Sequence, residues 1–549
     1  MWASGDDYSG LSFLVVDDFQ GMRSMLRDIL HQKNAGTIDL CVNGGEAISR
    51  LSKHHYDVVL CDYNLGPGRN GQQVLEEAKV RGLIGPACAW IMITGEKTND
   101  AVFGAVEYQP DAYLIKPVTA ALIFARLEKI WAKKSAFQEI DYALRARNFS
   151  KALRLCSERI AVDKVNAVEL MRLKIGILIN LGEMDQAAEL YQLILNRRDF
   201  PWAKAGLARI LMEKGNLAEA EQLLHSVLID HPAYLEAYDL QARVLQLQGM
   251  AAEAKLLLDR AIQLSPNSTA RQRLLGELAL ESGDLESAEK AFRKSVAIGE
   301  FSVFKSPDSF IGLAKTCSAK GSPEEALQVL TTLQKTFTGP TVQIQAKIVE
   351  GQVYQRNQQP VQAKAVAVAL GHMLNTHFSP LDENTSLELA TLLFAEGTQE
   401  QREQAQALLQ GLVKNNHDDQ KLLEKVQSVF TGAGMEEAGN ALVESTRKEA
   451  SDMMAKGVML AREGKLDEAV EWLRNAKTAM PTNLRVLLNT AHVMLEHLEK
   501  NGYQADLVTE ARSVLQDASR IRPKDERLLK LSTRMAHLLE ASRVKAPPG

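Results

Sequence analysis

A short motif that begins with glycine and ends in alanine recurs along much of the chain, about every 34 residues. Four of its copies are residues 182–187, 215–220, 249–254 and 283–288. Glycine ends a helix at little steric cost, and a small alanine lets the next helix pack closely against the first. Proline follows three of the motif glycines by seventeen residues, at Pro232, Pro266 and Pro481, where it stops the second helix. The period therefore predicts a two-helix unit that is repeated many times.

The period and its small residues resemble the tetratricopeptide repeat, a 34-residue helix-turn-helix unit. Small residues recur seven positions before the turn glycine, where that family needs close helix contact: Ala208, Ala242, Gly276, Ala314 and Gly457. The pattern predicts such repeats over residues 133–375, degenerate helical repeats over 376–451, and further repeats with a capping helix over 452–541. The resemblance implies an all-α solenoid that binds other proteins along a concave surface.

The N-terminal part of the chain has a different pattern, in which four short apolar runs each end in a polar residue. The runs end at Asp17 with its neighbour Asp18, at Asp62, at Thr94 and at Lys116. Helical patterns separate them, so the alternation over about 120 residues predicts a parallel sheet with right-handed crossovers. The carboxyl ends of parallel strands open on one edge of a sheet, so we expect these side chains to meet there.

Each of these polar residues alone would have an ordinary explanation, because an Asp after a buried strand is most often a turn former or a helix cap. Together they indicate chemistry. Three carboxylates repel one another unless a cation neutralises them, and hard oxygen ligands favour Mg²⁺. Thr94 can donate a hydrogen bond to a phosphoryl oxygen, and Lys116 can neutralise its charge. A carboxylate in this setting can attack a phosphoryl donor and hold an aspartyl phosphate.

Residues 11–132 resemble the receiver domain of bacterial two-component response regulators, and the segment FLVVDDFQGMR at 13–23 is particularly similar to the single-domain chemotaxis receivers. The resemblance implies a flavodoxin-like α/β fold with a five-stranded parallel sheet. It also implies that Asp62 is the phosphoacceptor, and that Asp17, Asp18, Asp62 and the backbone carbonyl of Asn64 hold Mg²⁺.

The same resemblance assigns a conformational switch. Thr94 matches its hydroxyl, Lys116 matches the phosphate-binding lysine, and Tyr113 matches the aromatic that turns inward when the hydroxyl moves. Without the resemblance, Tyr113 would be explained as a half-buried strand aromatic. Asn64 and Glu96 lie two residues past the acceptor and the switch hydroxyl, and both are polar, as in receivers whose phosphorylation is short-lived. A short phosphoryl lifetime is therefore a hypothesis for this chain.

The two kinds of pattern meet without a linker rich in Pro, Gly or Ser, because residues 131–147 stay helical in pattern. We expect continuous or closely abutted helices there, and a stiff joint of this kind can transmit a rotation. At the ends of the chain we expect an N-terminal tail over residues 1–10 and a disordered tail over residues 542–549.

The composition limits the classes of function. With 549 residues, of which 46% are hydrophobic and 24% charged, we expect several soluble globular domains. The formal net charge of -5 argues against a nucleic-acid partner. The sequence has no run of eighteen apolar residues, so we expect no membrane span. The N-terminus lacks signal-peptide features and the five scattered cysteines indicate reduced thiols, so we expect a cytoplasmic protein.

These features predict a phosphorelay response regulator that acts as a phosphorylation-gated adaptor. No phosphate-binding loop, zinc-protease motif or nucleophile elbow occurs, so we expect no enzyme activity beyond the receiver's own phosphorylation and dephosphorylation. A sensor histidine kinase or phosphotransfer protein would phosphorylate Asp62, and the repeats would bind a protein target that the sequence does not identify. Proteins of similar layout imply targets such as a sensor kinase or another regulator, whose signalling they restrain.

Other readings of the same features stay open. The switch face either meets the solenoid or pairs with another receiver, so a homodimer is one alternative. The chain could also be a phosphate sink that drains a sensor kinase. A third alternative is a constitutive scaffold for assembly of surface machinery, with a vestigial receiver.

Overall fold

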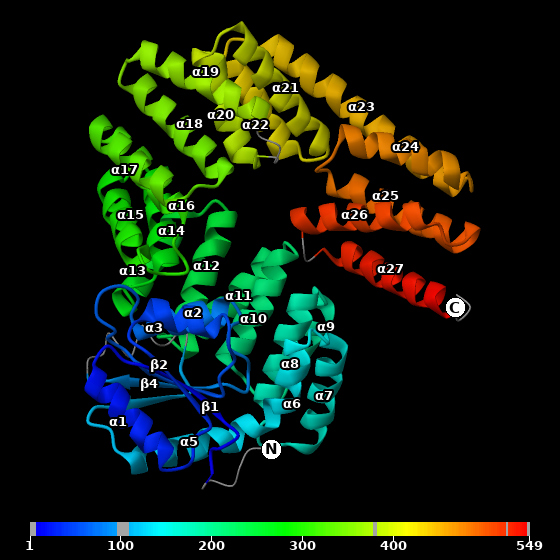
Figure 1. Cartoon of the computed structure of the whole chain (residues 1–549). Helices are drawn as coiled ribbons and strands as arrows, with labels where there is room; N and C mark the ends of the chain where they lie inside the picture. The colour runs from blue at the N-terminus through cyan, green and yellow to red at the C-terminus, as the bar shows by residue number, and fades with distance from the viewer. Residues whose placement is uncertain (1–6, 96–108, 377–380, 523–524, 546–549) are drawn as a thin grey trace. The chain divides into compact units, whose positions relative to one another are not determined.

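A computed structural model of the chain describes residues 7–95, 109–376, 381–522 and 525–545 (Figure 1). The chain divides into two compact units. The first holds residues up to Leu178 together with Asp185–Leu313, and the second holds Ile179–Met184 together with the residues from Ala314 onward. None of the described helices combines the length and the apolar character that crossing a membrane requires.

The first unit begins with a sheet and the helices that connect its strands. The strands are β1 Ser12–Val16, β2 Thr37–Cys41, β3 Val58–Asp62, β4 Ala89–Thr94 and β5 Ala112–Ile115. The helices are α1 Gln20–His31, α2 Gly44–Leu51, α3 Gly71–Val80 and α5 Ala120–Lys134. All neighbouring strands pair in parallel, in the order β2-β1-β3-β4-β5. The predicted flavodoxin-like sheet is confirmed.

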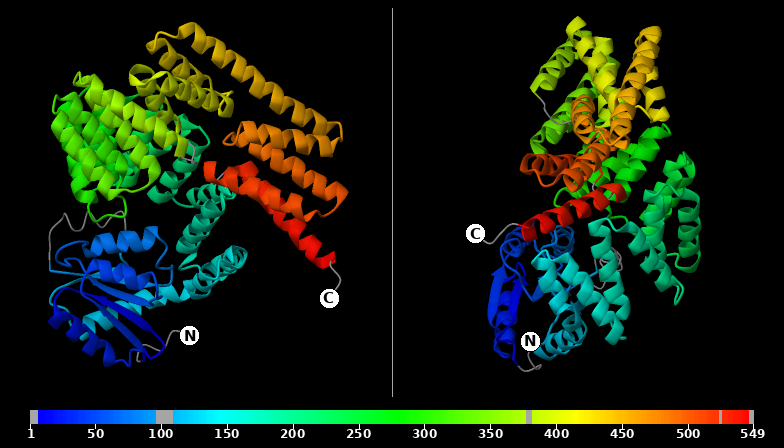
Figure 2. Two further views of the ribbon diagram at one scale, coloured as in Figure 1. Left: turned by 45° about the horizontal axis from the view of Figure 1, so that its top comes forward. Right: turned by 90° about the vertical axis from the view of Figure 1, so that its right-hand side faces the viewer.

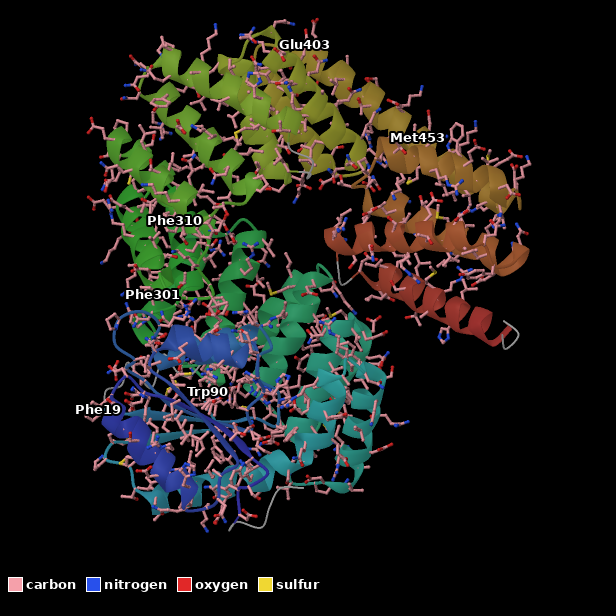
Figure 3. All side chains as sticks on the ribbon, viewed as in Figure 1. Phe19, Trp90, Phe301, Phe310, Glu403 and Met453 are labelled. Carbon is pink, nitrogen blue, oxygen red and sulfur yellow. The ribbon has the colours of Figure 1, made fainter. Side chains whose placement is uncertain are left out.

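Alternate residues of each strand point to opposite faces of the sheet, and helices cover both faces (Figure 2). Phe13 and Val15 of β1 lie in the core that also contains residues of α1 and α5. Leu14 of β1 lies in the opposite core, with residues of α2 and α3, and Trp90 of β4 is buried there too (Figure 3). Because both faces are buried, the strand ends are where polar side chains of the sheet reach solvent.

The N-terminal segment joins this core earlier than the sequence analysis expects. Tyr8, assigned above to a tail, is fully buried, and its ring centroid lies 4.7 Å from that of Trp131 and 5.9 Å from that of Phe13. Its backbone N–H donates to the carbonyl of Lys33 at 2.7 Å. The expectation of a tail was therefore wrong for Tyr8, because burial of an aromatic ring outweighs the entropy of ordering the short segment that carries it.

The rest of the chain is helical. Helix α5 leads directly into the short 3₁₀ helix η1 Ser135–Phe137 and then into α6 Gln138–Arg145, so the two modules abut as expected. The next helices are α7 Phe149–Val162, α8 Ala167–Leu181, α9 Met184–Leu195, α10 Pro201–Glu213, α11 Leu217–Asp230, α12 Leu235–Leu247, α13 Ala251–Leu264, α14 Thr269–Glu281, α15 Leu285–Gly299 and α16 Pro307–Ala319.

The helices that follow belong to the second unit. They are α17 Pro323–Thr336, α18 Pro340–Arg356, α19 Pro360–Thr376, α20 Glu383–Glu396, α21 Gln399–Asn415, α22 Gln420–Gly432, α23 Glu436–Arg462, α24 Leu466–Ala479, α25 Leu484–Asn501, α26 Ala505–Ile521 and α27 Glu526–Lys545. Helix α23 runs through residues 451 and 452, where the sequence pattern placed a boundary. Helix α27 includes residues 542–545, which the sequence analysis gave to a tail, because no proline stops it before Pro547.

The turn glycines and the small residues have the roles that the repeat pattern gives them. Gly215 and Gly249 have φ values of +81°, a left-handed conformation that suits glycine. At Gly276, an added Cβ atom would lie 2.8 Å from the ring of Phe292 on α15, so only glycine allows this close contact. These positions therefore have the turn and close-packing roles that the repeat pattern predicts.

Candidate functional site

The polar residues predicted to meet do so at the carboxyl-terminal edge of the sheet. Asp17 follows β1, Asp62 is the last residue of β3, Thr94 is the last residue of β4, and Lys116 follows β5. Asp17, Asp62 and Thr94 are only 1%, 5% and 7% exposed, whereas Asp18 is exposed. Parallel pairing of β1 with β3, β3 with β4 and β4 with β5 brings these ends side by side.

Lys116 bridges two of the carboxylates. Its Nζ atom donates to Asp62 Oδ2 at 2.8 Å and to Asp17 Oδ2 at 3.1 Å. Burial raises the pKa of Asp62, although the hydrogen bond from Lys116 and its positive charge oppose that rise. For Lys116 burial favours the neutral form, but the bonds to Asp62 and Asp17 outweigh it and raise its pKa. The ammonium group therefore stays charged beside a carboxylate that is held partly out of water.

The three aspartates form an oxygen-rich cluster. Asp17, Asp18 and Asp62 each offer a carboxylate oxygen, and these oxygens all lie within 4.8 Å of one another. Asp17 Oδ1 also accepts a hydrogen bond from the backbone N–H of Phe19 at 2.8 Å, which fixes its orientation. One ammonium group faces three carboxyl groups, so negative charge remains. Such a set of oxygen ligands fits a hard divalent cation such as Mg²⁺.

The loop after β3 brings glycine close to the cluster. Asn64 lies in this loop and is exposed. Gly66 has φ +70°, and a Cβ atom there would lie 3.3 Å from Asp18 Oδ2. At Gly71, the first residue of α3, an added Cβ would lie 2.1 Å from the carbonyl oxygen of Asp62. Glycine at position 71 therefore lets α3 begin directly against the backbone of Asp62.

Tyr113 points into the core on the side of α2 and α3. It pairs in register with Met92 of β4, and its ring packs with Tyr63 against that core. Its hydroxyl is buried and has no hydrogen-bond partner among the residues that the structure describes. Burial, with a smaller contribution from Tyr63, raises the pKa of Tyr113 to about 12. Glu96, which with Asn64 suggested a short phosphoryl lifetime, lies outside the described residues.

Two residues that the sequence patterns do not indicate shape this edge. Arg23 on α1 donates from Nη1 to the backbone carbonyl of Asp17 at 2.6 Å, which fixes the acidic loop to the first helix. Gly71 is the second, because its close approach to Asp62 is a tertiary contact. Asn70 marks a helix start in the sequence, because asparagine is a common N-cap residue. This local signal does not reveal that the backbone of Asp62 lies beside the first turn of the helix.

Comparisons with known proteins agree with both modules. The protein-family model of the response regulator receiver domain matches residues 13–128. Two models of the tetratricopeptide repeat match residues 197–244 and 240–303.

Similar proteins cover each module separately. Chemotaxis protein CheY-3 of Vibrio cholerae serotype O1 is 28% identical over 123 residues, which are 22% of this chain and 93% of that protein. Chemotaxis protein CheY of Pseudomonas aeruginosa is 25% identical over 123 residues, or 22% of this chain and 98% of that protein.

Among solved structures, CheY4 of Vibrio cholerae has a TM-score of 0.20 at 21% identity and covers 22% of this chain and 98% of its own. YrrB, described as a TPR protein with an unusual peptide-binding site, has a TM-score of 0.31 at 16% identity and covers 35% of this chain and 95% of its own. The family models and the chemotaxis relatives show that the chain has a response regulator receiver domain, similar to CheY, at its N-terminus and tetratricopeptide repeats after it.

Proposed function

We propose that this protein is a response regulator that is phosphorylated on Asp62 and that uses its repeats as a phosphorylation-gated adaptor. The observation that carries the proposal is the contact of the Lys116 ammonium with the buried Asp62 carboxylate, with Asp17 and Asp18 within 4.8 Å. In this proposal the receiver spans residues 11–132 and the interaction repeats follow it.

The chain's own residues supply most of the chemistry. The Asp62 carboxylate attacks the phosphorus atom while the bond from phosphorus to the donor's leaving group breaks. Lys116 balances the charge of the new phosphoryl group, and Thr94 offers a hydroxyl to one of its oxygens. Asp17, Asp18, Asp62 and the Asn64 carbonyl would hold Mg²⁺. When bound, this ion supplies positive charge to the phosphoryl oxygens and orients them.

The joint between receiver and repeats supports gating. Lys134, the last residue of α5, donates from Nζ to the carbonyls of Pro86 at 3.0 Å and Cys88 at 2.9 Å, and lies 3.0 Å from Asp111 Oδ1. Asp111 Oδ2 in turn accepts from the backbone N–H of Trp90 at 2.8 Å. The starts of β4 and β5 are therefore tied to the end of α5. The opposite ends of the same two strands carry the switch hydroxyl and the phosphate-binding lysine.

The first repeat helix continues this connection. Asp141 on α6 is only 3% exposed, and its Oδ2 accepts from Arg145 at 2.6 Å. A Cβ atom at Gly85, in the turn before β4, would lie 1.7 Å from Asp141 Oδ1, so α6 packs directly on that turn. A movement of β4 and β5 can therefore reach the repeats through packed side chains and not through a flexible tether.

The proposed partners follow from these roles. A sensor histidine kinase or a phosphotransfer protein donates the phosphoryl group, and a protein target binds the repeats. The receiver and repeat families are not catalytic families, so we propose no reaction beyond phosphorylation and dephosphorylation of Asp62. The cytoplasm, where a sensor kinase presents its phosphohistidine, is the proposed location.

The proposal is tested by incubating the full chain with acetyl phosphate and Mg²⁺ and measuring its intact mass. We expect one added phosphoryl group in the wild type and in Asp28→Asn, a control on the exposed side of α1. We expect none in Asp62→Asn or when Mg²⁺ is chelated. Equal labelling of Asp62→Asn, or no labelling of the wild type, would contradict the proposal and favour a scaffold with a vestigial receiver.

A further inference from the structure

Four helices of the first unit, each the first helix of a repeat, carry an arginine on a shared surface. These arginines are Arg172 on α8, Arg209 on α10, Arg243 on α12 and Arg273 on α14. Arg209 and Arg243 each stand six residues before a turn glycine, Gly215 or Gly249, so they occupy equivalent places in successive repeats. Arg172 and Arg273 stand ten residues before Gly182 and Gly283, which is about one helical turn earlier on the same helix face. The four guanidinium groups therefore recur on one face of successive first helices, at two repeat positions.

Contacts between neighbouring helices show that the row is continuous. The Arg172 guanidinium lies 5.2 Å from the ring centroid of Trp202 on α10. Arg209 donates from Nη2 to Glu236 Oε1 on α12 at 2.5 Å. On α14, the carboxylate of Glu277 pairs with Arg273, and Arg243 acts on it through charge alone. Side-chain contacts therefore join α8 to α10 and α10 to α12 in the first unit.

The part of this row on α8, α10 and α12 has an excess of positive charge. Arg172 and Arg243 are exposed, and neither has a carboxylate partner among the residues that the structure describes. Arg209 shares Glu236 with the hydroxyl of Tyr234, which donates to Glu236 Oε2 at 2.8 Å. Among the described residues, Glu236 is thus the one carboxylate within hydrogen-bonding distance of these three guanidinium groups, and the more distant Glu277 is already paired with Arg273. We call Arg172, Arg209 and Arg243 the arginine strip.

A second acidic residue of α12 does not cancel this charge. Asp239 accepts two hydrogen bonds from the buried guanidinium of Arg271, both at 2.7 Å, so its charge is already balanced. The half-buried rings of Trp202 and Tyr234 lie beside the strip. Arginine, tryptophan and tyrosine are the residues most enriched where protein partners bind tightly.

Resting on the adaptor role proposed above, we propose that the arginine strip binds an extended acidic segment of a partner protein, with carboxylates about three residues apart. The spacing follows from geometry. Packed helices lie about 8–10 Å apart. An extended chain in the polyproline II conformation advances about 3.1 Å per residue with three residues per turn, so side chains three residues apart face the same way and are about 9 Å apart. Each carboxylate then forms a two-pronged, charge-assisted hydrogen bond with one guanidinium.

The test measures fluorescence anisotropy of labelled peptides titrated with the full chain. One peptide carries Asp at every third position, a second has the same composition with its Asp residues adjacent, and a third has Lys in place of Asp. A single-stranded oligonucleotide is the fourth probe. We expect the first peptide to bind most tightly and its affinity to fall with added salt. Equal binding of the lysine peptide, or tighter binding of the oligonucleotide, would overturn the proposal.

Two variants locate the site. Arg243→Ala removes one guanidinium of the strip, and we expect it to weaken binding of the spaced peptide about tenfold, the usual effect of losing a charged hydrogen bond. Arg260→Ala removes an exposed arginine from α13, outside the strip, and should leave binding unchanged. Equal weakening by both variants would reject the strip as the site.

The same titration separates this proposal from the proposed gating. Addition of beryllofluoride and Mg²⁺ occupies the receiver without changing the peptide. Binding that Arg243→Ala weakens, but that beryllofluoride leaves unchanged, would keep the arginine strip and reject gating. If wild type and Arg243→Ala bind the spaced peptide with equal affinity, and beryllofluoride changes both affinities equally, the arginine strip would be rejected and gating would be kept.

Discussion

The Lys116 ammonium lies 2.8 Å from the Asp62 carboxylate, at the ends of two strands that are not neighbours in the sheet. The strand between them, β4, ends in Thr94, so Asp62, Thr94 and Lys116 form one row across the edge. This pair explains how a buried carboxylate can stay ionised, because a buried charge needs a charged or hydrogen-bonding partner.

The raised pKa of Asp62 predicts how stability depends on pH. A carboxyl group whose pKa is raised by folding stabilises the folded state below its ordinary pKa, and this contribution is lost as pH rises through the folded pKa. In the wild type without Mg²⁺, the free energy of unfolding should therefore fall as pH rises through the weakly acidic range. We expect this fall to be smaller in Asp62→Asn, which lacks the titrating group. Urea unfolding at several pH values measures this. Asp28→Asn is the control, and an unchanged slope in Asp62→Asn would contradict burial as the dominant cause.

Removal of the hydroxyl group should have opposite effects on stability at Tyr113 and at Tyr56. Tyr113→Phe removes a hydroxyl without a described partner, so we expect a gain in unfolding free energy on the order of 1 kcal/mol. Tyr56→Phe removes a hydroxyl that donates to Asp39 Oδ2 at 2.5 Å, so we expect a loss of similar size. Urea unfolding of both variants measures the difference. A loss of stability in Tyr113→Phe would mean that its hydroxyl is bonded in solution.

The contact between Gly71 and the Asp62 carbonyl predicts a steric effect. Gly71→Ala places a Cβ atom where the backbone of Asp62 already lies, and we expect it to destabilise the receiver by about 1–3 kcal/mol. It should also slow phosphorylation by acetyl phosphate, since the acceptor must shift. Gly10→Ala is the matched control, because an added Cβ there meets nothing within 4 Å. Equal stability of the two variants would contradict this steric effect, because α3 would then move away from Asp62 at little cost in free energy.

The contacts of Lys134 allow a test of the joint between the receiver and the repeats. Lys134→Met removes the bonds to the Pro86 and Cys88 carbonyls and to Asp111. We expect faster amide hydrogen exchange in α6 and at the starts of β4 and β5, because these segments lose their common anchor. Lys133→Met changes the neighbouring exposed lysine and should leave exchange unchanged. The same exchange rates in both variants would remove Lys134 from the connection.

Much of the fold follows from patterns that short-range chemistry imposes. An apolar run that ends in a carboxylate or lysine marks the end of a buried strand, so Asp17, Asp62 and Lys116 could be placed on one edge before any contact was known. Glycine at a fixed period marks a left-handed turn, as at Gly215, where φ is +81°. In such cases the residue and its local conformation determine each other.

The remaining features depend on contacts between distant segments. Arg147 and Gln358 take the left-handed turn conformation at φ +54°, although neither is glycine, because the packed helices on either side hold the turn. The burial of Tyr8 requires Trp131, and the anchoring of Lys134 requires carbonyls that lie 46 and 48 residues earlier in the chain. No local pattern carries this information, because register and packing are set only when the whole unit folds.

The central claim is that a phosphoryl group on Asp62 changes the repeats. Hydrogen exchange of α6 and α7, measured with and without beryllofluoride and Mg²⁺ in wild type and Asp62→Asn, tests it most directly. We expect exchange in these helices to change in the wild type and not in Asp62→Asn. Exchange that changes around β5 but stays the same in α6 and α7 would contradict the account, because the receiver would then switch without informing the repeats.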